Sequence, residues 1–126
     1  MNNSTNALNW FEIPAKDILR SKEFYENIFS IEMPLNEIYN TKMAFFPWES
    51  NSGKATGALA ESKDHIPGIT GTIVYLNADP DLEQVLKKVE KAGGKILMAK
   101  TNIGNNGFIA FLEDTEGNKV GIHSME

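Results

Sequence analysis

The chain has 126 residues, 41% of them hydrophobic and 23% charged, which is ordinary for one globular domain with its own core. The formal net charge of −5 argues against nucleic acid as a partner, because binding phosphates requires clustered lysines and arginines. The lack of cysteine excludes disulfides, thiolate metal sites and a cysteine nucleophile.

The N-terminal stretch MNNSTNALNW lacks the basic segment and the apolar segment of a signal peptide. No apolar run in the chain approaches the roughly 20 residues that a membrane helix needs. The sequence therefore predicts no membrane association, and the cytoplasm is the expected location.

The first half begins with strand-forming residues in NWFEIP, followed by Asp17 at a predicted helix start. In that helix Phe24, Tyr25, Ile28 and Phe29 group on one side. Three strand-like stretches separated by turn residues then follow, in IEMPLNEIYN, TKMAFFPWES and KATGALAES.

The second half repeats this order after a predicted linker, Lys63 to Gly71. A strand is predicted from Thr72 to Ala78, and Asp79-Pro80 is predicted to begin a helix. That helix is amphipathic, with apolar residues at helical spacing, and Gly93-Gly94 ends it; the apolar residues are Leu82, Val85, Leu86 and Val89. Three further strands are predicted, in KILMAKT, GFIAFLED and NKVGIHSM, with tight turns at IGNNGF and DTEGN.

The two halves can be superimposed along the sequence. Placing Trp10 on Ile73 gives an offset of 63 residues, and placing Gly57 on Gly121 gives 64. The chain is therefore predicted to be an α+β protein of two tandem βαβββ modules, about 7–62 and 72–125, joined by the linker. The modules are expected to form a curved, mostly antiparallel sheet whose uncovered faces enclose a cavity.

Two motifs resemble the vicinal oxygen chelate superfamily, which contains glyoxalases, bleomycin resistance proteins and dioxygenases. DILRSKEFYENIF is similar to the first-helix signature of that family, and FIAFLEDTEGNKVGIHS is similar to its closing hairpin. The resemblance covers about residues 7 to 125. It implies paired βαβββ modules, a site inside the curved sheet and, commonly, a homodimer.

The metal-dependent members of this family hold a divalent cation on the first and last strands of each module. The corresponding positions are predicted to be Trp10, Ile73, Gly57 and Gly121, none of which has a side chain able to bind a metal. We therefore expect neither a metal nor a cofactor, and no cation-dependent chemistry of the glyoxalase or dioxygenase type.

Residues two apart on a strand share a face, so the residues beside these positions are expected to face the cavity. The candidates for ligand binding are Trp10, Tyr75 and Asn77, and the candidates for catalysis are Glu12 and His123. Burial would raise the pKa of Glu12 and suit it to act as a general base, with His123 as its partner in proton transfer.

Each candidate also has a simpler interpretation. Glu12 would be a solvent-facing strand residue, and His123 would be an exposed residue near the C-terminus. Trp10 and Tyr75 would be packing residues. His65, in the linker, is expected to be exposed, as are Asp114 and Glu116 in the last turn.

The predicted function is recognition of a small organic molecule in the cavity. One hypothesis is a metal-free lyase or isomerase that uses Glu12 and His123. A second is a protein that sequesters an antibiotic or metabolite without catalysis, and a third is a regulatory module without ligand chemistry. A hydrogen-bonded acid–base pair, about 3 Å apart, would favour the enzyme.

Overall fold

The computed structural model describes residues 1–126 and contains the two predicted modules in order. The first module consists of β1 (Trp10–Pro14), α1 (Ile18–Phe29), β2 (Leu35–Ile38), β3 (Thr41–Phe45) and β4 (Thr56–Glu61). The second consists of β5 (Tyr75–Asn77), α2 (Glu83–Val89), β6 (Lys95–Asn102), the 3₁₀ turn η1 (Gly104–Asn106), β7 (Phe108–Glu113) and β8 (Lys119–Ser124). The α+β fold class with tandem βαβββ modules is confirmed.

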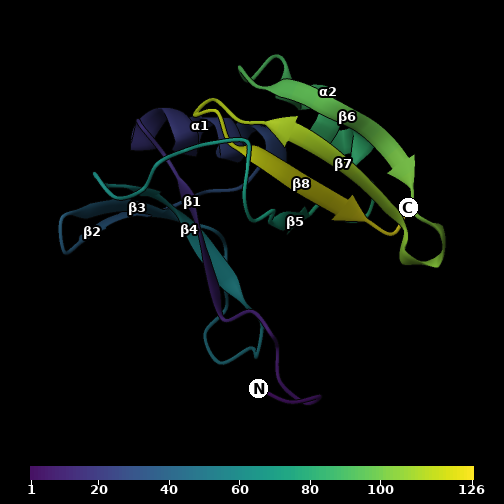
Figure 1. The fold of residues 1–126 in the computed structure, drawn as a ribbon, viewed down its shortest axis with the longest axis horizontal. Helices are drawn as coiled ribbons and strands as arrows, with labels where there is room; N and C mark the ends of the chain where they lie inside the picture. Colours follow the sequence, from purple (N-terminus) through teal and green to yellow (C-terminus); the bar gives the residue numbers. More distant parts are fainter.

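The strands form two four-stranded sheets, ordered β1-β4-β3-β2 and β5-β8-β7-β6. In each sheet the first pair is parallel and the other two pairs are antiparallel. Figure 1 shows the sheets as separate units at an angle to each other, with both helices on the same side. β1 and β5 are edge strands of different sheets and do not pair with each other. The two modules therefore share no ladder of backbone hydrogen bonds.

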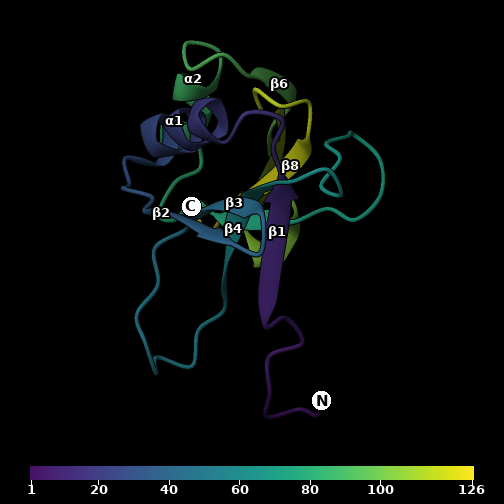
Figure 2. The ribbon, with the colours of Figure 1, turned by 90° about the vertical axis from the view of Figure 1, so that its left-hand side faces the viewer.

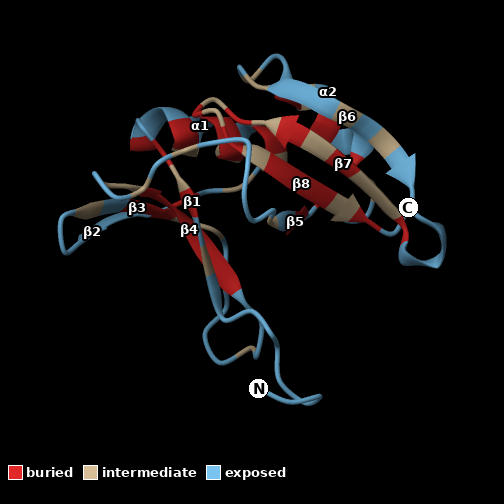
Figure 3. Ribbon diagram, viewed as in Figure 1, coloured by how far each residue is buried: buried red, intermediate tan, exposed pale blue.

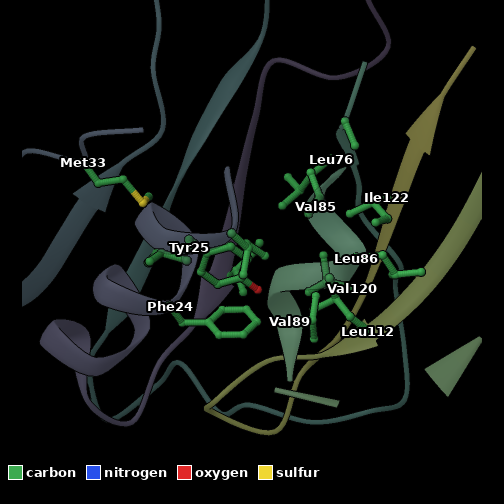
Figure 4. Close-up of a cluster of buried hydrophobic side chains, with 14 of the residues drawn as sticks. Phe24, Tyr25, Met33, Leu76, Val85, Leu86, Val89, Leu112, Val120 and Ile122 are labelled. Carbon is green, nitrogen blue, oxygen red and sulfur yellow. The ribbon is translucent and has the colours of Figure 1, made fainter. Parts of the chain in front are cut away.

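The core lies between the two helices and the sheet faces that they cover. Phe24, Tyr25 and Ile28 of α1 are buried, and so are Val85, Leu86 and Val89 of α2; all six belong to one cluster of 19 buried residues (Figure 4). The helices lie side by side above the strands in Figure 2. This shared core holds the modules together.

Burial differs between the strands: β4 is buried along most of its length, β2 is exposed, and β7 largely alternates (Figure 3). Ile13 of β1 and Leu59 of β4 face the helices, as do Leu76 and Ile122 in the second module. Their neighbours Glu12 and Tyr75 are on the opposite, open face of each sheet. Residues 1–10 are exposed.

The strand register corrects one predicted equivalence. Glu12 lies opposite Ala58, and Tyr75 lies opposite Gly121, so the offset of 63 residues holds in both strands. Gly57 was predicted to match Gly121, which is wrong by one residue: a side chain at Gly57 would meet Phe11, on the side of the helices. The offset of 64 residues fails because the turn glycines before these strands, Gly53 and Gly117, precede the first strand residues Thr56 and Lys119 by different distances.

The helix ends are partly as predicted. Asp17 caps α1, and its carboxylate accepts hydrogen bonds from the backbone N–H groups of Leu19 and Arg20. The start of α2 was predicted at Asp79-Pro80, but the helix begins at Glu83. The Asp81 carboxylate accepts from the Glu83 N–H, and the Ser124 hydroxyl accepts from the Leu82 N–H, so the cap chemistry lies two residues further along the chain.

The predicted strand from Thr72 to Ala78 is also shorter than expected, because only Tyr75–Asn77 lie in β5. Residues 72–74 are not part of a strand, although the Val74 carbonyl still accepts a hydrogen bond from the Gly121 N–H of β8. No helix in the structure is both long and apolar enough to cross a membrane.

Candidate functional site

A histidine of the linker, His65, lies against the carboxylate of Glu12. Its Nε2 is 2.7 Å from Glu12 Oε1, although the residues are 53 positions apart in the sequence. The other carboxylate oxygen accepts a hydrogen bond of 3.1 Å from the indole N–H of Trp10. Both oxygens of Glu12 are therefore held in place. The expectation that His65 is simply exposed was wrong, because its side chain is only 22% exposed.

Ser62 continues this chain of contacts on the other side of the imidazole ring. Its hydroxyl oxygen is 2.6 Å from Nδ1 of His65, and it also accepts a hydrogen bond from the backbone N–H of Asp64. An ionised carboxylate only accepts hydrogen bonds, so Nε2 of His65 is the atom that carries the proton toward Glu12. In the neutral ring Nδ1 then accepts from the Ser62 hydroxyl. Ser62, His65 and Glu12 form one continuous path for a proton.

The pKa of Glu12 is lowered, and the main cause is the hydrogen bond from His65. Partial burial opposes this effect, while the Trp10 indole N–H reinforces it. The folded protein thus favours the ionised form of Glu12. The contact stabilises the fold fully at a pH above the pKa that Glu12 has in the unfolded chain. This stabilisation is lost as the pH falls through the lower pKa that Glu12 has in the folded protein. The expectation that burial raises the pKa of Glu12 is therefore wrong.

Glu12 also lines a cavity of about 430 Å³ where the two modules meet. The cavity lies beneath the linker, between the end of β1 and the start of β8. Its wall includes Glu12, Thr70, Thr72, Asn118, Lys119 and Val120. This volume falls within the range typical of sites for small ligands.

Aromatic side chains occupy the open face of each sheet. The ring of Trp10 packs against Phe45, with centroids 6.0 Å apart, and the ring of Tyr75 packs against Phe111, with centroids 5.7 Å apart. Trp10 and Tyr75 are nevertheless 41% and 47% exposed. Each ring therefore combines a packing contact with an exposed face, and neither ring lines the cavity beside Glu12.

The other two predicted residues make different contacts. The Asn77 side chain accepts a hydrogen bond from the Asp79 N–H, and Asn77 lines a separate, more apolar cavity of about 230 Å³. His123 uses Nε2 to donate to the backbone carbonyl of Asn106, at 2.6 Å. The structure thus brings Trp10 and Glu12 together, but it pairs Glu12 with His65 and ties His123 to the turn before β7.

The carboxylates of the last turn are not exposed, as was expected, but buried. Asp114 and Glu116 are only 3% and 4% exposed. Asp114 accepts hydrogen bonds from the Tyr25 hydroxyl, the Asn118 side chain and two backbone N–H groups. Glu116 accepts from the backbone of Lys16 and Asp17 and from Arg20. These contacts join the two modules and are structural.

Hydrogen bonding decides the ionisation of Glu116. Burial alone would raise its pKa, but the hydrogen bonds from Arg20, the Asp17 backbone and the Thr115 hydroxyl outweigh burial and lower it. At Asp114 the balance is reversed, since burial outweighs four hydrogen bonds and the pKa rises.

The strand positions that correspond to metal ligands in the resembled family do not fit a divalent cation. The positions expected from the sequence are Trp10, Ile73, Gly57 and Gly121, and the register replaces Gly57 by Ala58. None of these residues has an imidazole, carboxylate or thiolate. No group of three or more His, Cys, Asp or Glu side chains comes together elsewhere.

Sequence reasoning missed His65, Ser62 and Lys119 as parts of the site. His65 and Ser62 lie outside the regular strands, so alternation assigns them to neither face. The only local signal is a serine three residues before a histidine in a loop, which is too common a pattern to indicate a site.

Comparison with known proteins supports the fold. Putative glyoxylase CFP32 of Mycobacterium bovis is 27% identical over 118 residues, which cover 90% of this chain and 44% of that protein. The chain thus spans less than half the length of the curated relatives it matches.

Two solved structures have the same fold. A glyoxalase/bleomycin resistance protein from Albidiferax ferrireducens gives a TM-score of 0.70 at 16% identity, covering 96% of this chain and 100% of that one. The fosfomycin resistance protein FosX from Listeria monocytogenes gives 0.67 at 14% identity, covering 100% and 96%. A family model matches residues 7–122. The chain belongs to the glyoxalase/bleomycin resistance protein/dioxygenase superfamily.

Proposed function

We propose that this protein binds a small organic molecule in the cavity between its modules and transfers a proton to or from it, without a metal ion. The observation that carries the proposal is the 2.7 Å contact between Glu12 and His65 at the cavity. A carboxylate and an imidazole in contact can accept a proton and relay it, which is what an isomerase or lyase requires.

Three further features support this proposal. The lowered pKa of Glu12 keeps it in the form that accepts a proton. The Ser62 hydroxyl and the Trp10 indole fix the imidazole ring and the carboxylate in orientation. The rings of Trp10 and Tyr75 do not line this cavity, but they are exposed on the same open sheet faces as Glu12 and offer apolar surface to a part of the ligand that extends beyond the cavity.

The alternative function is sequestration of an antibiotic or metabolite without catalysis. It is favoured by the similarity in fold to a fosfomycin resistance protein and a bleomycin resistance protein. In this case the aromatic rings would hold the ligand, and Glu12 would contribute only a hydrogen bond.

The first experiment is a thermal-shift screen against metabolites and antibiotics, with elemental analysis of the purified protein. A hit is then incubated in D₂O and followed by NMR, because an enzyme that removes a proton from carbon introduces deuterium into the ligand. A ligand that stabilises the protein and exchanges no hydrogen indicates sequestration. A stoichiometric divalent metal would contradict the metal-free mechanism.

The exchange reaction also distinguishes the two histidines. Glu12→Gln and His65→Gln are each expected to slow deuterium incorporation by about a hundredfold or more, the usual contribution of general acid–base catalysis. His123→Gln tests the pair predicted from the sequence. If this variant abolishes exchange while His65→Gln leaves it intact, the assignment to His65 is wrong.

We also propose that the protein forms a homodimer, since exposed apolar side chains line the strands that end each sheet. These include Leu35 and Ile38 of β2, Tyr75 of β5 and Ile96 and Leu97 of β6. Light scattering coupled to size-exclusion chromatography is expected to give twice the chain mass of 14.0 kDa. A single-chain mass at micromolar concentration would contradict this expectation.

A further inference from the structure

The wall of the cavity opposite Glu12 contains a free cation. Lys119, the first residue of β8, lines the cavity, and no carboxylate lies within ion-pair distance of its ammonium group. The nearest interaction is with the ring of Phe111, 4.4 Å from Nζ to the centroid. Glu113 lies opposite Lys119 on β7, but its ion pair is with Lys95. Lys119 is therefore a cation in the cavity wall that has no carboxylate partner in the protein and only the Phe111 ring as a contact of its ammonium group.

Two hydroxyl groups beside Lys119 are also without partners in the protein. Thr70 and Thr72 line the cavity and are exposed, and no side-chain hydrogen bond in the chain involves either hydroxyl. By contrast, the Asn118 side chain is fully engaged, since it donates to Pro14 and Asp114 and accepts from the Gly68 N–H. All the polar groups left free on this wall can donate a hydrogen bond: the ammonium group only donates, and the two hydroxyls can also accept.

The carboxylate of Glu12 is partly engaged within the protein, and it keeps a spare lone pair on each oxygen. Both oxygens of Glu12 accept hydrogen bonds, from His65 and from Trp10. A donor of the ligand can therefore still reach Glu12, while Lys119 and the two hydroxyls are unused and available to an anionic oxygen group of the same ligand. Charge-assisted hydrogen bonds to such a group are about twice as strong as neutral ones.

We propose that the cavity selects small organic acids, with the carboxylate or phosphate bound by Lys119, Thr70 and Thr72. The remainder of the molecule extends toward Glu12, where a hydroxyl or an acidic C–H meets the carboxylate. This inference rests on the proposed function and adds the ligand class to it. The anionic group supplies affinity, while Glu12 and His65 act at the other end of the ligand.

The test uses two matched pairs of probes: mandelate with methyl mandelate, and glycerol phosphate with glycerol. Binding is followed by the amide NMR signals of Gly68, Thr70, Thr72 and Lys119. One or both acids are expected to shift these signals and to bind about tenfold or more tightly than their neutral counterparts. Comparison of the two acids shows whether the site prefers carboxylate or phosphate.

Lys119→Gln is expected to weaken binding of the acid about tenfold and to leave the neutral probe unaffected. Lys54→Gln is the matched control, because it removes the same charge from an exposed lysine that does not line the cavity. Equal losses in the two variants would indicate a general effect of net charge and would overturn the inference.

Failure of the inference differs from failure of the proposed function. If neutral compounds from the thermal-shift screen shift the cavity signals and Lys119→Gln does not alter binding of any acid, the ligand class is wrong and the binding function stands. If neither acids nor neutral compounds shift these signals, the binding function is wrong as well. Circular dichroism and chemical denaturation of both variants establish that the fold is retained.

Discussion

Asp114→Ala is expected to lower the free energy of unfolding by about 3 kcal/mol. The carboxylate of Asp114 accepts hydrogen bonds from the Tyr25 hydroxyl, the Asn118 side chain and two backbone N–H groups. Alanine would leave these buried donors without acceptors, and each unsatisfied buried group costs about 1–3 kcal/mol. Burial raises the pKa of Asp114, so removing its charge offsets part of this loss. The expected loss in the free energy of unfolding is therefore well below the sum of the costs of four unsatisfied donors.

Urea denaturation at neutral pH measures this change. Tyr25→Phe removes only one of the four donors and is expected to cost about 1 kcal/mol. Asp64→Ala replaces an exposed aspartate whose side chain makes no hydrogen bond, and it should stay within about 0.5 kcal/mol of the wild type. An Asp114→Ala variant as stable as Asp64→Ala would show that the buried turn contributes nothing to the fold.

The elements with regular periodicity could be predicted from the sequence. Leu82, Val85, Leu86 and Val89 recur at helical spacing, and all four are buried in the core. The repeat of strand, helix and three strands is visible twice, so the two modules followed from the order of elements alone. Alternation along β1 also placed Glu12 correctly on the face opposite Ile13, because neighbouring strand residues point to opposite sides.

The partners of these residues could not be predicted in the same way. His65 reaches Glu12 because the linker folds back over the end of β1, and a loop without periodicity gives no signal of its path. Similarly, Glu116 is buried because Arg20 and the backbone before α1, about 100 residues earlier, supply its hydrogen bonds. A carboxylate in a turn has the same local sequence whether distant donors meet it or water does.

The two strand glycines illustrate a third kind of error. Gly57 and Gly121 have similar surroundings in the sequence, yet they face opposite sides of their sheets. At Gly57 an added Cβ would clash with the backbone oxygen of Phe11 and would lie 2.6 Å from its ring. At Gly121 the nearest atoms, at 2.5 Å, belong to the Tyr75 side chain. A shift of one residue in the alignment thus changes which side of the sheet a substitution disturbs.

Gly57→Ala is therefore expected to destabilise the protein by about 3 kcal/mol, at the upper end of the cost of overpacking. The Phe11 carbonyl cannot move away without disturbing the parallel pairing of β1 with β4, so the clash must be relieved by the backbone. Gly121→Ala meets a ring that is nearly half exposed and can turn toward solvent, so it should cost less than about 1 kcal/mol. Urea denaturation of both variants compares the costs directly. Equal costs, or a larger cost at Gly121, would contradict the register of β4 and restore the equivalence of the two glycines that the sequence suggests.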